Sequence, residues 1–138
     1  MGEGERRAVE MRRHAAGLVA RVASARVRLD YSVASLRVVD FLVEGLRKGS
    51  AGVGPERVLF GLGAYVGEVL VRRAGAVWVD FDETQRAYFR QDVGVRMPDG
   101  RVWNPLGRVR NRYEVGPEES LATFYLTLPG RRGGRVPR

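Results

Sequence analysis

The chain has 138 residues, 44% of them hydrophobic, and a formal net charge of +8 from 24 basic and 16 acidic side chains. This length predicts a single domain that buries a core without a metal or a disulfide. Cysteine is absent, which excludes disulfides, thiolate metal sites and cysteine nucleophiles and agrees with the cytoplasmic location that we expect. No long apolar run follows the charged N-terminal stretch, so we expect neither a signal peptide nor a membrane contact.

The basic charge consists almost entirely of arginine. Lys48 is the only lysine, so 23 of the 24 basic residues are arginines, as the codons of a GC-rich genome favour. Four of these arginines lie in the last nine residues, 130–138. No nucleic-acid-reading motif accompanies the charge, so we expect at most weak, non-specific binding of nucleic acid.

Helices are predicted over the first half of the chain. Apolar residues recur at three and four positions over residues 5–26, 32–47 and 55–73. Ser32 is expected to cap the second of these helices. Pro55 suits the first turn of the third, and Gly75 is expected to end it.

Strand patterns appear between the helices. Residues 27–31 alternate apolar and polar side chains, which predicts a short extended segment. Residues 76–81 are β-branched and aromatic, and residues 92–105 form a predicted hairpin that turns at 98–100.

Two further helices are predicted near the C-terminus, over residues 105–113 and 118–127, and Asn104 is expected to cap the first of them. The predicted fold class is therefore α+β, with about three N-terminal helices, a small antiparallel sheet of about three strands and one or two C-terminal helices. We expect residues 1–129 to form one domain, frayed over roughly its first eight residues, and residues 130–138 to form a disordered basic tail.

The stretch GLGAYVG, residues 61–67, raises the question of a phosphate-binding loop. Val66 stands where a dinucleotide-binding loop needs its third glycine, and Glu68 stands where a P-loop needs lysine. The helical alternative explains the glycines better. Gly63 and Gly67 share one helix face, and we expect them to let another element, the second helix, approach closely.

Thirteen residues between 29 and 128 match the pattern of a family of small actinobacterial domains without an assigned activity. They are Tyr31, Ser32, Leu36, Gly63, Tyr65, Gly67, Glu68, Gly75, Trp78, Pro105, Val109, Phe124 and Tyr125. The chain resembles this family most closely in its Gly-x-Tyr-x-Gly-Glu helix. The resemblance implies the fold and the domain limits but no activity. Domains of similar architecture occur among the immunity proteins of bacterial toxin systems.

Candidate catalytic groups are few. Glu68, inside an apolar helix, is a candidate general acid. The alternative is that Glu68 has a structural role, in an ion pair with Arg72 one turn later. Asp80 and Asp82 share a strand face that suits a hard cation, but without a recognisable loop spacing we expect no metal. His14 is the only histidine and is expected at the surface, and we expect no cofactor.

The function class therefore rests on binding residues. Arg108, Arg110 and Arg112 lie in one short predicted helix, either as a solvated face or as a grip for an anion. The candidate partner-binding residues are Gly63, Tyr65, Gly67, Glu68, Trp78, Arg108 and Arg112. We expect a protein-interaction module, regulatory or immunity-like, whose partner is a protein, with a homodimer as one candidate. The alternatives are a non-specific nucleic-acid-binding protein and an enzyme that uses Glu68 or Asp80.

Overall fold

The computed structural model describes residues 2–49 and 55–129. The predicted disordered tail, 130–138, lies outside the described residues. The elements follow in the order α1 (Glu3–Ala23), α2 (Ser35–Gly49), α3 (Glu56–Ala74), β1 (Val77–Asp80), α4 (Glu83–Phe89), β2 (Val93–Arg96), β3 (Val102–Trp103), α5 (Pro105–Val115), a 3₁₀ turn (Pro117–Glu119) and α6 (Leu121–Thr127).

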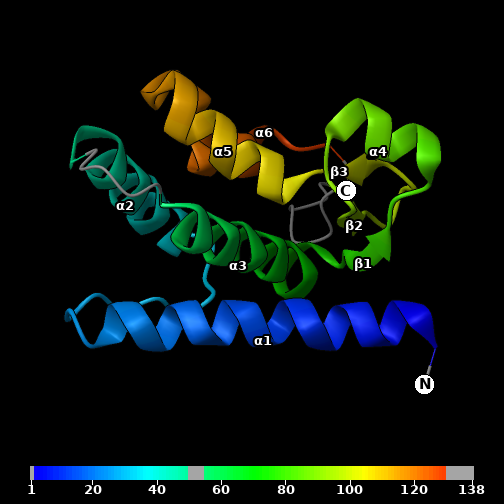
Figure 1. Ribbon diagram of the computed structural model, residues 1–138, viewed down its shortest axis with the longest axis horizontal. Coiled ribbons are helices and arrows are strands. Elements are labelled where there is room, and N and C mark those ends of the chain that lie inside the picture. The colour runs from blue at the N-terminus through cyan, green and yellow to red at the C-terminus, as the bar shows by residue number, and fades with distance from the viewer. Residues whose placement is uncertain (1, 50–54, 130–138) are drawn as a thin grey trace, which may run out of the picture.

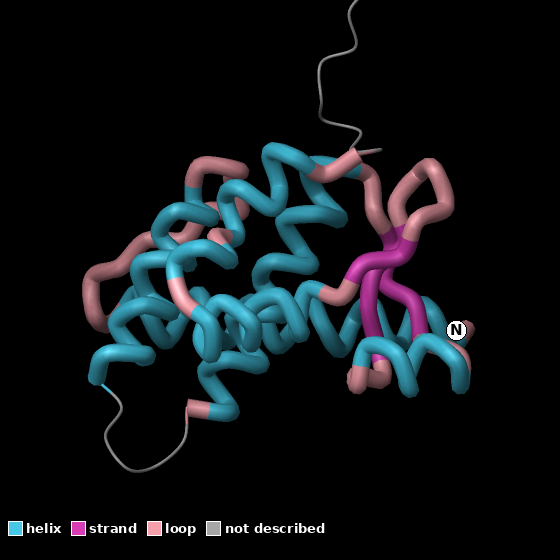
Figure 2. Tube along the Cα trace, turned by 90° about the horizontal axis from the view of Figure 1, so that it is seen from above, coloured by secondary structure: helices cyan, strands magenta, loops and turns pink. Residues whose placement is uncertain are grey.

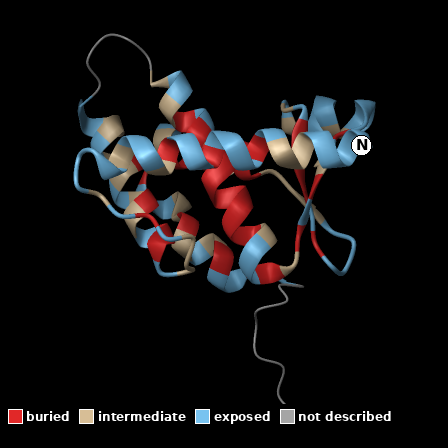
Figure 3. Cartoon of the chain, turned by 90° about the horizontal axis from the view of Figure 1, so that it is seen from below, coloured by how far each residue is buried: buried red, intermediate tan, exposed pale blue. Residues whose placement is uncertain are grey.

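Helix α3 is the centre of the fold and lies between α1 and α5 (Figure 1). Every residue from 61 to 70 is buried, so this helix is enclosed on all sides. Helix α1 buries only a narrow stripe that includes Met11, Ala15 and Leu18. Its outer face is exposed, and the buried residues gather behind it (Figure 3).

A three-stranded antiparallel sheet, in the order β1-β2-β3, lies at one end of the helices (Figure 2). Val95 of β2 is opposite Trp78 of β1 on one side and opposite Trp103 of β3 on the other. The predicted hairpin is thereby confirmed, with a turn whose Gly100 has a φ of 92°. The α+β architecture that the sequence predicts is the one that the chain adopts.

Two predicted local elements differ from the structure. The segment 27–31 pairs with no strand in the described chain; instead Leu29 is buried and Tyr31 takes a φ of 64°. The predicted helix over 118–127 is interrupted, because Ser120 leaves the helical conformation and caps α6 through the Thr123 N–H.

Helix α4 was not predicted. It begins after Asp82, whose carboxylate accepts the Gln85 N–H at 2.8 Å while the Gln85 side chain accepts the Asp82 N–H. A reciprocal cap of this kind marks the start of a helix in a sequence. The acidic residues here also resembled a cation site, so the helix was missed.

The predicted caps of other helices are confirmed. Ser32 Oγ accepts the Ser35 N–H at 3.1 Å at the start of α2. Asn104 accepts the Gly107 N–H at 2.9 Å ahead of Pro105, and Gly75 ends α3 with a φ of 77°.

Candidate functional site

Six of the seven predicted partner-binding residues are buried. They are Gly63, Tyr65, Gly67, Glu68, Trp78 and Arg112, whereas Arg108 is half-buried. Their side chains or backbone surfaces are used in contacts within the chain. A partner therefore cannot reach these six residues in the conformation that the chain adopts.

The glycines of α3 face three different elements. A Cβ added at Gly61 would lie 3.1 Å from the Leu18 Cβ of α1, and one added at Gly63 would lie 2.8 Å from the Leu106 Cα of α5. A Cβ at Gly67 would overlap the ring of Trp78 in β1. The prediction of close packing is confirmed, but the prediction that α2 is the packing partner is wrong. Because helix α3 is central, its glycines allow α1, α5 and β1 to pack closely against it on different sides.

Glu68 is 2% exposed and is held by two partners. Its Oε2 accepts the Trp78 indole N–H at 2.8 Å, and its Oε1 pairs with Arg72 Nε at 3.3 Å. The ion pair with Arg72 is the structural alternative that the sequence offered. Both carboxylate oxygens are thus occupied, which leaves neither aimed at a ligand.

Tyr31 and Tyr65 extend this buried polar network. Their rings stack at 4.8 Å, and the Arg72 guanidinium lies 3.6 Å above the Tyr31 ring. The Tyr65 hydroxyl accepts the Tyr31 N–H at 2.7 Å and lies 2.6 Å from Ser35 Oγ. Because Ser35 Oγ donates to the Ser32 carbonyl, it accepts from Tyr65 in turn. These contacts hold Tyr31 in its left-handed conformation.

Arg112 joins α5 to α2 and, through Asp40, to α6. It lies 2.8 Å from Glu44 Oε1 and 3.3 Å from Asp40 Oδ1. Asp40 also accepts the Leu121 N–H at 2.8 Å and the Ser120 hydroxyl at 2.9 Å, so one carboxylate anchors the start of α6. Arg112 therefore has a structural role, and it is only 4% exposed.

The three arginines of α5 point to different neighbours. Arg108 lies 4.5 Å over the ring of Phe124, Arg110 pairs with Glu56 and Glu114, and Arg112 is buried against α2. A helix turns about 100° per residue, so alternate positions diverge. Arg108, Arg110 and Arg112 therefore do not form one continuous cationic face.

A hollow of about 730 Å³ lies between α1, α3 and α5. We call it the first hollow. Its lining residues are Arg13, His14, Gly17, Leu18, Arg21, Glu56, Arg57, Leu59, Phe60, Gly61, Gln91, Leu106 and Arg110. The floor is made of leucines and glycines, and the rim carries four arginines against one glutamate.

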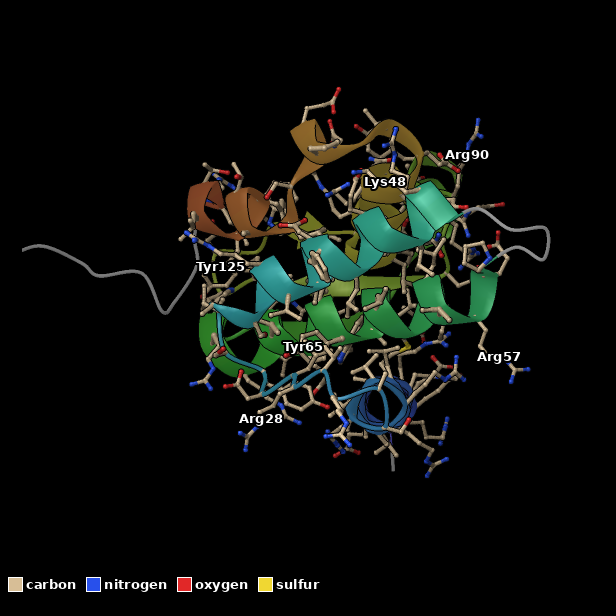
Figure 4. The ribbon with its side chains drawn as sticks, turned by 90° about the vertical axis from the view of Figure 1, so that its left-hand side faces the viewer. Arg28, Lys48, Arg57, Tyr65, Arg90 and Tyr125 are labelled. Carbon is tan, nitrogen blue, oxygen red and sulfur yellow. The ribbon has the colours of Figure 1, made fainter. Side chains whose placement is uncertain are left out.

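Three of the rim arginines have no side-chain partner. Within residues 2–49 and 55–129, Arg13, Arg21 and Arg57 are exposed and form no ion pair or hydrogen bond through their guanidinium groups. Figure 4 shows Arg57 projecting away from the body of the molecule. Phe60 beside them is 37% exposed, and its ring packs nearly perpendicular to the His14 ring, with 4.8 Å between the ring centroids. The exposed position of His14 confirms the sequence-based expectation.

A second hollow of about 930 Å³ adjoins the first, because Gln91 and Arg110 line both. It lies between α4, β3 and α5 and includes Arg90, Arg108 and the 80% exposed Tyr88. Arg57 and Arg90, one from each hollow, project on the same side of the molecule (Figure 4). We call the two joined hollows the arginine groove.

Asp80 at the end of β1 and Asp82 after it both have partners within the chain. Asp80 pairs with Arg7 of α1 at 2.6 Å, and Asp82 caps α4. Among the described residues no group of three or more potential metal ligands lies together. Both aspartates therefore have structural roles.

The groove residues Arg13, Arg21, Arg57 and Phe60 escaped the sequence-based prediction as a site. They lie on two helices, and no spacing within either helix reveals that these residues line one hollow.

No family model, curated protein or solved structure matches the chain. Within the described ranges, no helix has both the length and the apolar character needed to cross a bilayer.

Proposed function

We propose that the protein is an interaction module that binds another protein in the arginine groove. The observation that carries this proposal is the first hollow, where leucines and Phe60 are framed by unpaired arginines. Protein interfaces combine an apolar centre with a polar rim, and arginine and aromatic residues are enriched in them.

The arrangement of α1 around this hollow supports the proposal. Arg13, Gly17 and Arg21 lie four residues apart, so they follow one face of the helix. A Cβ added at Gly17 would meet nothing within 4 Å. The missing side chain leaves open space between two cations, and a partner's side chain fits that space.

Catalysis is less well supported, because the two candidate acids already have partners. Glu68 is bound by Trp78 and Arg72 and lines neither hollow, and Asp80 pairs with Arg7. A catalytic acid needs a free oxygen within reach of a substrate. The groove offers hydrophobic and cationic groups instead, which serve binding.

A photo-crosslinking experiment tests this function. Phe60 is replaced by benzoylphenylalanine, and the matched control carries the same group at Phe41, a 76% exposed position on α2. We expect position 60 to crosslink a discrete protein from the source cells and position 41 to give no such adduct. The captured protein, once purified, should bind the unlabelled chain, and Phe60→Ser should weaken that binding while Phe41→Ser leaves it unchanged. Equal adducts at both positions would contradict the proposal.

Nucleic acid is the second candidate partner, and the joined groove is the observation that favours it. Arg13, Arg21, Arg57, Arg90, Arg108 and Arg110 line it against Glu56 and Glu114. Phosphate-driven affinity falls steeply with salt concentration, because each neutralised phosphate releases counterions. A titration of a mixed-sequence DNA over a range of salt therefore measures this activity directly.

A further inference from the structure

We infer that the occupant of the first hollow is an acidic amphipathic segment of the partner protein, with carboxylates that flank two or three apolar side chains. This inference rests on the proposed function and adds the chemistry of the partner. Three features of the hollow specify it: the placement of the free cations, the apolar floor and the size of the space.

The free cations come from two helices that face each other. Arg13 and Arg21 are eight residues apart on α1, which corresponds to about 12 Å along the helix axis. Arg57 lies at the start of α3 on the other side of the hollow. An occupant that satisfies all three guanidinium groups therefore carries carboxylates on both of its flanks, separated by a strip that contacts neither.

The floor between these cations takes apolar groups. Leu18, Leu59 and Leu106 line it, and Phe60 is the large apolar side chain that it exposes most. A cavity of about 150 Å³ holds one benzene ring, so about 730 Å³ holds several apolar side chains but not a whole helix. A helix that lays one apolar face into the hollow fits this volume.

A nucleic acid fits the first hollow less well. Single strands bind through bases that stack on flat aromatic faces, whereas this floor is aliphatic and its one phenyl ring is already in contact with His14. Phosphates would satisfy the arginines but would leave the exposed ring of Phe60 without an apolar partner. Nucleic acid is accordingly an outcome that the test must separate from a peptide.

The test uses the full chain and a synthetic probe peptide of about 18 residues, long enough for a stable helix. The probe has a stripe of leucine and phenylalanine with glutamate on both flanks. A second peptide carries lysine in place of glutamate, and an oligo(dT) of about 20 nucleotides supplies the phosphate control. Binding is followed by fluorescence anisotropy, and amide shifts at Gly17 and Gly61 locate the bound peptide.

The decisive variant is Gly17→Leu, because the structure has open space where this side chain would go. A leucine in an exposed helical position favours the helix, so the melting temperature should rise while the peptide affinity falls at least about tenfold. The control is Gly45→Leu on α2, where a Cβ also meets nothing within 4 Å. This control should raise the melting temperature and leave peptide binding unchanged.

A charge-reversal pair tests the cations. Arg13, Arg21 and Arg57 are changed to glutamate together, and the control changes Arg28, Arg37 and Arg96, which are exposed arginines outside both hollows. Both triple variants have the same net charge. Only the triple variant at Arg13, Arg21 and Arg57 should bind the acidic peptide more weakly, by at least about tenfold in affinity, because close charge pairs act locally.

Three results would overturn the inference. In the first, the acidic peptide binds no better than the lysine peptide. In the second, both triple variants lose affinity for the acidic peptide equally. In the third, oligo(dT) binds more tightly than the acidic peptide, and Gly17→Leu weakens that binding. The first two results leave the proposed function intact if position 60 still crosslinks a protein whose binding depends on Phe60. Failure of both the crosslinking and the peptide experiments overturns the function together with the inference.

Discussion

The indole N–H of Trp78 donates to Glu68 at 2.8 Å across the space that Gly67 leaves open on α3. The hydrogen bond depends on the packing of the ring against Gly67, because the indole reaches the carboxylate only where α3 lacks a Cβ at position 67. This contact fixes the sheet to the central helix.

The substitution Gly67→Leu should destabilise the protein by several kcal/mol or prevent folding, since overpacking typically costs about 1–3 kcal/mol and this side chain would displace a buried indole ring. The measurement is thermal unfolding by circular dichroism. Gly45→Ala is the matched control and should stabilise the protein by up to about 1 kcal/mol, because that site is open. An unchanged melting temperature for Gly67→Leu would contradict the packing described for Trp78.

Removal of the Glu68 carboxylate should cost about 1–3 kcal/mol in Glu68→Ala, because the buried indole N–H of Trp78 loses its acceptor. Glu68→Gln should cost less, since its carbonyl oxygen still accepts from Trp78. Urea denaturation gives the free energies of unfolding, and the indole proton resonance of Trp78 reports the hydrogen bond. If Glu68→Gln proves as damaging as Glu68→Ala, the ion pair with Arg72 dominates instead.

Tyr65→Phe removes the hydroxyl that accepts the Tyr31 N–H and bonds to Ser35. We expect a loss of about 1–3 kcal/mol, as for other buried groups left without a partner. Tyr88→Phe is the control, because Tyr88 is 80% exposed, and it should leave stability unchanged. Equal melting temperatures for the two variants would show that the hydroxyl network contributes nothing.

The hydrogen bond from Arg112 holds the pKa of Glu44 below its ordinary value of 4.5, and the nearby charges of Arg112, Arg47 and Lys48 act in the same direction. The unfolded chain therefore binds the proton first as the pH falls. The stability that Glu44 contributes is present above its unfolded pKa and is lost as the pH falls through the lowered folded pKa.

We expect Glu44→Gln to be less stable than the wild type near neutral pH and to lose less stability on acidification. Melting temperatures measured between about pH 7 and about pH 3 test this, and the difference between the two proteins isolates Glu44 from other carboxylates such as Asp30, whose pKa is also lowered. Parallel curves for the two proteins would contradict the role assigned to Arg112.

Local signals in the sequence predicted most of the elements. The apolar periodicity of α2 and α3, the caps at Ser32 and Asn104, and the hairpin turn each depend on residues a few positions apart, so the sequence alone contains the physical cause. The alternation over 27–31 predicts a strand, but Tyr31 takes a left-handed conformation, which long-range contacts with Tyr65 and Arg72 stabilise.

The candidate site was decided by tertiary structure. The sequence drew attention to Gly67 and Glu68 because they are unusual inside an apolar helix, and to Arg112 because it lies one turn from Arg108. All three are buried, and their contacts within the chain give them structural roles. Arg13, Arg21 and Arg57 look like ordinary surface arginines, and only the packing of α1 against α3 places them around one hollow. The sequence by itself therefore determined the α+β elements and the lack of cysteine chemistry, because both depend on local composition and spacing. The groove depends on which helices meet, and that was settled by the glycine contacts of α3 with Leu18, Leu106 and Trp78.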